Sequence, residues 1–126
     1  MKEYLLLFRG GYDRIMQQPE QEFLSHMDKW KKWMNNLEKQ KIFVAAQPLG
    51  RTGKQVIGRD KVVTDGPFVE GKEIVGGYLI CKALSYDEAV VIAKGCPILE
   101  AGGIVEVREI TEMDDVTAGY LKTHKT

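Results

Sequence analysis

The sequence predicts an α+β protein in which two helices pack on one antiparallel sheet. Three observations support this class. Four short runs are rich in apolar residues typical of strands, a long segment carries an apolar residue at every third or fourth position, and a second such segment begins with a helix-capping pattern. The chain has 126 residues, of which 44% are hydrophobic and 29% are charged. This length and composition fit one globular domain with a core of its own.

The first half of the chain reads as strand, helix and strand. A continuous apolar run predicts a strand at Glu3–Arg9, buried on both faces, and a polar loop follows as far as Pro19. Proline at a first helical turn and acidic residues near it predict a helix from Pro19 to about Lys41. A second strand follows at Ile42–Leu49. The buried side of the helix is expected to carry Phe23, Met27, Trp30, Met34 and Leu37.

The second half repeats this pattern after an inserted hairpin. Ser85 and Glu88 form a capping box, and Pro97 ends the helix that starts there. In the last strand, side chains alternate between the faces of the sheet, with Val105 and Val107 opposite Glu106 and Arg108. The expected elements are a hairpin at Gln55–Arg59 and Lys61–Thr64, a strand at Gly77–Lys82, a helix at 85–96 and a strand at Ile104–Ile110.

Without the hairpin, this is the βαββαβ order of a ferredoxin-like fold. Two helices on one face of the sheet leave the other face bare. A second copy packed sheet to sheet would cover that face, so we expect a homodimer. Residues 1–110 form the domain. Residues 111–126 are expected to be a polar C-terminal tail, in which Tyr120 and Leu121 either dock on a partner or fray.

Composition and motifs exclude several classes of protein. Eighteen basic and eighteen acidic residues give a net charge of zero, which argues against direct binding of nucleic acid. Cys81 and Cys96 lack CxxC spacing and are expected to be free thiols. We expect a cytoplasmic protein without membrane contact, because neither a targeting segment nor a membrane-spanning run is apparent. We expect no metal and no cofactor, because the sequence holds no metal-ligand cluster, phosphate loop or nucleophile motif.

The stretch at 63–77 holds the first candidate for a functional site. Asp65-Gly66-Pro67 is a turn signal, because glycine permits positive φ and proline fixes its own φ. The aromatic Phe68 follows where a solvated turn would have a small polar residue. Asp65 is therefore a candidate to transfer a proton or to hold a polar ligand. Alternatively, its carboxylate accepts the N–H groups of the turn that it starts.

This stretch resembles the DGPF branch of the YCII-related proteins. The resemblance covers most of residues 1–110, and it implies a ferredoxin-like fold that dimerises into an α/β barrel around a pocket. The family is mostly without a defined function. The matching residues are Asp65-Gly66-Pro67-Phe68, Lys72-Glu73, Gly76-Gly77-Tyr78, Ser85–Ala93, Cys96-Pro97 and Gly102-Gly103 to Glu106-Val107-Arg108, together with Tyr4–Phe8.

His26 is the candidate base of the long helix. It lies just beside the apolar stripe, from where it could reach a pocket and titrate near neutral pH, or it is a surface histidine. YCII-type proteins often carry a histidine in this helix, paired with an aspartate and proposed as catalytic. That position corresponds here to Trp30, with His26 one turn earlier. If Trp30 replaces the histidine, the His–Asp dyad is absent.

Further residues are candidates for binding a small molecule. Trp30 and Trp33 share one side of the helix, where they offer a stacking surface or fill the core. Arg9 and Arg108 could hold an anionic group on the open sheet face, or form ion pairs with an acidic neighbour. The remaining candidates near the expected pocket are Phe68, Glu73 and Tyr78, with a solvated loop as the alternative for Glu73.

Two hypotheses for function follow. In the first, the homodimer binds an unknown small molecule near the Asp65 loop and serves as a ligand sensor or interaction module. Some DGPF-type relatives are associated with transcription sigma factors, which implies that regulatory roles occur in the family. In the second, the protein is a cofactor-free isomerase or lyase, in which Asp65, with or without His26, transfers protons.

Overall fold

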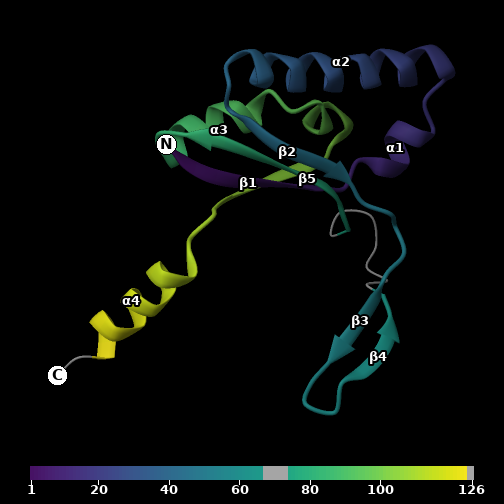
Figure 1. Ribbon diagram of the computed structural model, residues 1–126. Helices are drawn as coiled ribbons and strands as arrows, with labels where there is room; N and C mark the ends of the chain where they lie inside the picture. Colours follow the sequence, from purple (N-terminus) through teal and green to yellow (C-terminus); the bar gives the residue numbers. More distant parts are fainter. Residues whose placement is uncertain (67–73, 125–126) are drawn as a thin grey trace.

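The computed structural model describes residues 1–66 and 74–124, and it confirms the α+β class (Figure 1). Helices at 20–39 and 86–94 lie on one face of a four-stranded sheet, and a two-stranded hairpin stands apart from it. In chain order the elements are β1 (Lys2–Arg9), α1 (Tyr12–Met16), α2 (Glu20–Lys39), β2 (Phe43–Pro48), β3 (Lys54–Ile57), β4 (Val62–Asp65), β5 (Val75–Ala83), α3 (Tyr86–Lys94), the 3-10 helix η1 (Pro97–Ala101), β6 (Ile104–Glu109) and α4 (Met113–His124).

The main sheet is antiparallel throughout, with strand order β2-β5-β1-β6. In β1, Leu6 pairs with Leu79 of β5 and with Val107 of β6. The strand alternates between buried and half-buried residues, so only one of its faces is buried within a single chain. The apolar run is continuous because β1 is a central strand, but the helices cover only the face that carries Leu6.

The core lies between this face and helices α2 and α3. Leu6, Leu79 and Cys81 of the sheet have no exposed surface, and Leu37 of α2 packs in the same cluster. At the start of α3, the Glu88 N–H donates to Ser85 Oγ at 3.2 Å, as the capping box predicts. The Glu88 carboxylate reaches back as well, but it accepts from the N–H of Leu84, one residue earlier than expected.

Three segments differ from the prediction. The segment before Pro19 was expected to be a loop but contains α1, which is held by the buried Ile15. After Pro97 the chain forms η1 rather than running directly into the last strand. Residues 113–124, expected to be part of a tail, form α4, in which every described residue is exposed.

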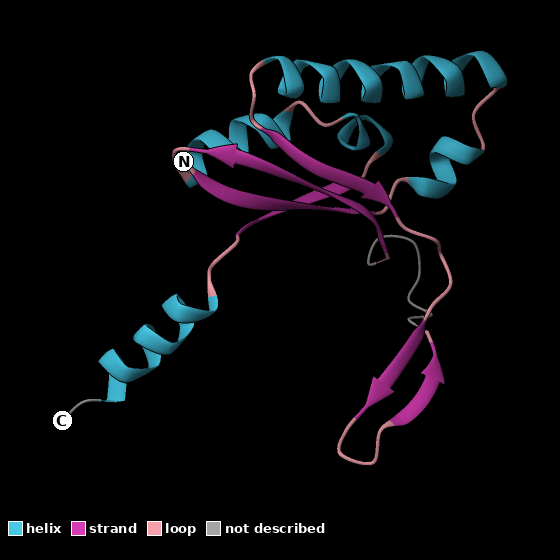
Figure 2. Cartoon of the chain, viewed as in Figure 1, coloured by secondary structure: helices cyan, strands magenta, loops and turns pink. Residues whose placement is uncertain are grey.

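The face of the sheet opposite α2 and α3 is uncovered within the described residues (Figure 2). It carries half-buried apolar side chains, among them Leu5 and Leu7 of β1 and Ile80 of β5. The β3–β4 hairpin, which the sequence predicts, and α4 both extend to this side of the sheet (Figure 1). No helix of the described chain is long and apolar enough to cross a membrane.

Candidate functional site

Helix α2 buries the predicted stripe except for Met27, and it buries His26 as well. His26 is 5% exposed and Trp33 is 8% exposed, whereas Met27, expected inside, is 40% exposed. The side of α2 that packs on the body carries the predicted residues Phe23, Trp30, Met34 and Leu37. His26 and Trp33 are buried on the same helix. The surface alternative for His26 is therefore wrong. Helical spacing alone does not decide between Met27 and its neighbour His26, and contact with the body selects His26.

The two tryptophans pack around Phe8 of β1. The ring centroid of Phe8 lies 5.1 Å from that of Trp30 and 6.1 Å from that of Trp33, both in edge-to-face geometry. Trp33 Nε1 donates to the carbonyl oxygen of Ile92 in α3 at 3.2 Å. Both side chains therefore serve the packing of α2 on the body, and Trp33 is the more deeply buried.

His26 and Trp30 are joined by a hydrogen bond along α2. Trp30 Nε1 donates to His26 Nε2 at 2.9 Å. Because an indole N–H can only donate, His26 Nε2 must be unprotonated, and the hydrogen of the neutral ring is on Nδ1. Burial lowers the pKa of His26 below its ordinary value; the positive charge of Lys29 adds to this, and the Glu100 carboxylate opposes it. The neutral ring is thus the stable form near pH 7.

His26 forms part of the wall of a cleft of about 410 Å³, here called the His26 cleft. Lys29 Nζ of α2 and a carboxylate oxygen of Glu100 in η1 form an ion pair at 2.9 Å beside it. This bond to Lys29 lowers the pKa of Glu100. Gln18 Oε1 is buried and lacks a hydrogen-bond partner among the described residues. The full lining is Gln18, Gln21, Glu22, Ser25, His26, Lys29, Glu100 and Ala101.

Sequence reasoning identified only His26 of this lining. Lys29, Gln18 and Glu100 were not among the candidates. Glu100 lies 71 residues after Lys29, and no local pattern connects the two. Only the packing of η1 beside α2 brings them together.

Asp65 lies elsewhere, at the end of β4 in the hairpin. Its carboxylate forms an ion pair with Lys54 Nζ at 2.6 Å, and its side chain is 65% exposed. Asp65 does not line the His26 cleft, so the structure does not bring the two candidate catalytic residues into one cleft. Phe68 and Glu73, candidate ligand contacts of the same loop, lie outside the described residues.

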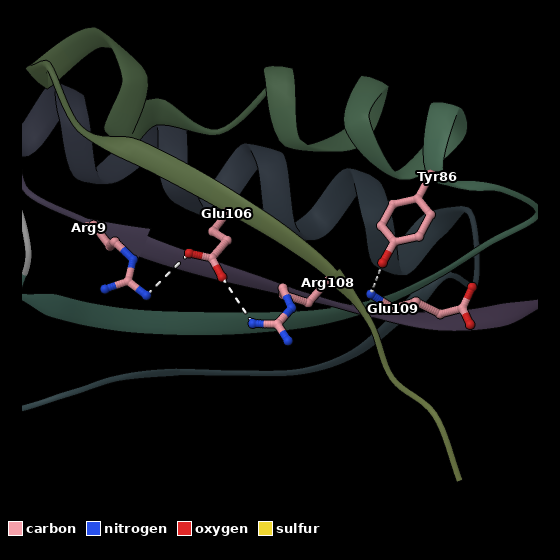
Figure 3. A network of polar contacts seen from close by, with 5 residues as sticks. All are labelled: Arg9, Tyr86, Glu106, Arg108 and Glu109. Carbon is pink, nitrogen blue, oxygen red and sulfur yellow. Dashed lines mark hydrogen bonds and ion pairs between the residues drawn. The ribbon is translucent and has the colours of Figure 1, made fainter. Parts of the chain in front are cut away.

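The open sheet face carries the two candidate arginines on either side of Glu106 (Figure 3). Arg9 Nη2 lies 3.2 Å from one oxygen of Glu106, and Arg108 Nη1 lies 3.4 Å from the other. This is the ion pairing that the sequence offered as the alternative to anion binding. Tyr78 is half-buried on the same face, in register with Leu7 of β1. At the end of β6, the Tyr86 hydroxyl accepts the N–H of Glu109 at 2.8 Å (Figure 3).

A second cleft, of about 350 Å³, lies around α1. The Arg51 guanidinium stacks 4.4 Å above the ring of Tyr12 and forms an ion pair with Asp13 at 2.6 Å. None of these residues was predicted to belong to a site. Among the described residues, no group of three or more His, Cys, Asp or Glu side chains could hold a metal ion.

Comparison with known sequences identifies the family. The sequence model of the YCII-related domain matches residues 7–114. This chain belongs to the YCII-related domain family. In this YCII-related protein, Trp30 and His26 of α2 are joined by a hydrogen bond. A search of curated proteins found no match.

A solved structure supports the fold of this YCII-related chain. It is that of 5-chloro-2-hydroxyhydroquinone dehydrochlorinase (TftG) from Burkholderia phenoliruptrix AC1100, in complex with 2,5-dihydroxybenzoquinone. The TM-score is 0.50 and the sequence identity is 16%. The alignment covers 90% of this chain and 97% of TftG. The two proteins therefore have similar folds over nearly their full lengths.

Proposed function

We propose that this protein binds a small molecule and that the His26 cleft is the binding site. One observation carries the proposal: a histidine that is 5% exposed stands in the wall of a cleft, and its Nδ1–H has no partner among the described residues. This N–H is therefore available to donate a hydrogen bond to a ligand in the cleft. The cleft volume of about 410 Å³ lies in the range typical of small-molecule sites. TftG, of similar fold, was crystallised with a small cyclic molecule.

The rival function is proton-transfer catalysis of the isomerase or lyase type. Two observations favour binding over it. His26 Nε2, the nitrogen that would act as a base, already accepts a hydrogen bond from Trp30. Asp65, the second proposed catalytic group, pairs with Lys54 in the hairpin and does not line the His26 cleft. A ligand-sensing or regulatory role requires no base. It needs only a hydrogen-bond donor, which the Nδ1–H group of His26 provides.

A thermal-shift screen with neutral, cationic and anionic cyclic compounds tests this function. A ligand that binds the native state at 100 times its Kd stabilises it by about 2.7 kcal/mol, which raises Tm. We expect the shift to be lost in His26→Asn and kept in the control His124→Asn, whose ring lies in the exposed helix α4. A compound that stabilises the wild type and His26→Asn equally would place the ligand elsewhere and contradict the proposal.

We further propose that the protein is a homodimer with a ferredoxin-like subunit, in which two sheets pack face to face and form an α/β barrel. The strand order β2-β5-β1-β6 supports the ferredoxin-like assignment. Three features support the dimer: the uncovered apolar side chains of the sheet, the position of α4 and the position of the hairpin. An isolated hairpin or a helix of this length is marginal by itself, and both extend to the side where a second copy would lie.

Light scattering at micromolar concentration tests the dimer. We expect twice the mass of the chain for the wild type and the mass of the monomer for Leu7→Glu, which puts a charge on the open face. The matched control is Val91→Glu on the outer side of α3, where the side chain is already exposed. A wild-type monomer would overturn the proposal, as would a Leu7→Glu dimer of undiminished affinity.

A further inference from the structure

The hydrogen-bonding groups of the His26 cleft indicate which kind of ligand it accepts. Trp30 occupies His26 Nε2, so the ring can present only Nδ1–H to a ligand, as a donor. A ligand group beside His26 must therefore supply an acceptor. A bound ammonium group would find no lone pair on this ring.

Gln18 places the opposite requirement on the same cleft. Its Oε1 is buried and unpaired among the described residues, and Gln18 belongs to the lining. An amide oxygen can only accept, so a ligand group that reaches Gln18 Oε1 has to supply a donor. The cleft thus combines one donor and one acceptor, neither of which is satisfied by the described protein.

The charges around the cleft disfavour an anion. Glu22 and Glu100 contribute two carboxylates to the lining and Lys29 contributes one ammonium group, which gives a net charge of minus one. The Lys29 ammonium is already paired with Glu100 at 2.9 Å. A carboxylate ligand would meet net repulsion, and its oxygens could not satisfy Gln18 Oε1. An uncharged group with both hydrogen-bonding functions fits all three conditions.

Resting on the proposed function, we propose that the His26 cleft binds an uncharged group that donates to Gln18 Oε1 and accepts from His26 Nδ1–H. A carboxamide is the simplest such group, because its N–H and C=O lie side by side. The Trp30–His26 bond is the specificity device: it maintains His26 as a donor and so selects the carbonyl of the ligand. Trp30 acts through His26 and is a positioning residue.

Three probes that share a benzene ring test the ligand class: benzamide, benzoate and benzylamine. Titration is followed by NMR at the His26 ring nitrogens and the Gln18 side-chain amide. We expect benzamide to shift both signals and to bind about ten-fold more tightly than either charged probe, since each good hydrogen bond contributes about 1 kcal/mol or more. The chemical shifts of the His26 ring nitrogens should show that the proton stays on Nδ1 in the complex.

Matched variants assign the contact to Gln18. Gln18→Leu removes the buried acceptor and should weaken benzamide about five- to ten-fold, without changing the affinity for benzoate. The control Gln17→Leu, an exposed neighbour that does not line the cleft, should change neither. Trp30→Phe should let the neutral His26 ring carry its proton on either nitrogen. The difference in affinity between benzamide and the two charged probes should then become smaller.

The possible failures can be distinguished. If benzoate or benzylamine shifts the His26 signals and binds more tightly than benzamide, the proposed ligand class is wrong. The proposed binding function would still stand. Equal benzamide affinity in Gln18→Leu and wild type would overturn the role of Gln18 and with it the proposal. If no probe moves the His26 signals, this inference is wrong, and the thermal-shift screen with His26→Asn decides separately whether the cleft binds anything.

Discussion

Trp30 Nε1 donates to His26 Nε2 at 2.9 Å, and each residue thereby satisfies the buried polar group of the other. The pair lies one turn apart on the inner side of α2, against Phe8 of the sheet. In this arrangement a tryptophan, through a single hydrogen bond, determines which nitrogen of a neighbouring histidine carries the proton. The consequences can be measured without knowing the ligand.

Trp30→Phe should raise the pKa of His26 from its lowered value towards the ordinary value of about 6.5. The indole N–H opposes protonation of Nε2, and phenylalanine removes it. The loss of the bond should lower the free energy of unfolding by about 1–3 kcal/mol. The measurement is an NMR titration of the His26 ring. Trp33→Phe, which loses the bond to Ile92 instead, should leave the His26 pKa unchanged; an equal shift in both variants would contradict the assignment.

Stability should fall as the pH decreases through the range in which His26 titrates. The unfolded chain binds a proton at about pH 6.5, whereas burial lowers the folded pKa, so the unfolded state binds more protons in between. The contribution is fully present above about pH 6.5 and is lost progressively as the pH falls towards the folded pKa. Urea unfolding at about pH 7.5 and about pH 5 measures it. His26→Gln should flatten this dependence, and His124→Gln should not; identical slopes in all three proteins would exclude His26 as the cause.

Both cysteines should be unreactive while the protein is folded. Burial raises the pKa of Cys81 to about 11 and that of Cys96 to about 12, so almost no thiolate exists at about pH 8. A thiol reagent such as Ellman's reagent should label neither residue in the native protein and both in guanidinium chloride. Rapid labelling of the native protein would mean that one of these side chains is accessible.

Gly103→Ala should destabilise the protein by about 1–3 kcal/mol, the range for overpacking a core. A Cβ at this position would meet Ile98 Cγ1 at 2.5 Å and the carbonyl oxygens of Arg9 and Ile98 at 3.0 Å. The backbone atoms cannot move away as a flexible side chain can. Gly50→Ala is the control, because nothing lies within 4 Å of its added Cβ. Thermal unfolding should show a lower Tm for the first variant only; equal values would refute the close contact.

Local chemistry predicted the elements of the fold with good boundaries. The β1 strand, the long helix, the hairpin and the capped start of α3 follow from apolar period, turn residues and the Ser85–Glu88 pair, all of which act within a few residues. Helix α1 was missed because its five residues are too few to show a helical repeat of apolar residues. Burial of Ile15 against the body holds this helix in place. Helix α4 was missed because its segment lacks a buried side.

By itself, the sequence determined the family, the α+β class and the open sheet face, because these depend on motifs and periodicities that are local to each element. Only the tertiary structure decided the site. It turned α2 so that His26 faces inward in place of Met27, and it set Glu100 beside Lys29 to complete the cleft. The physical reason is that a helical repeat allows neighbouring stripes of similar polarity, and only contacts between distant segments select one of them.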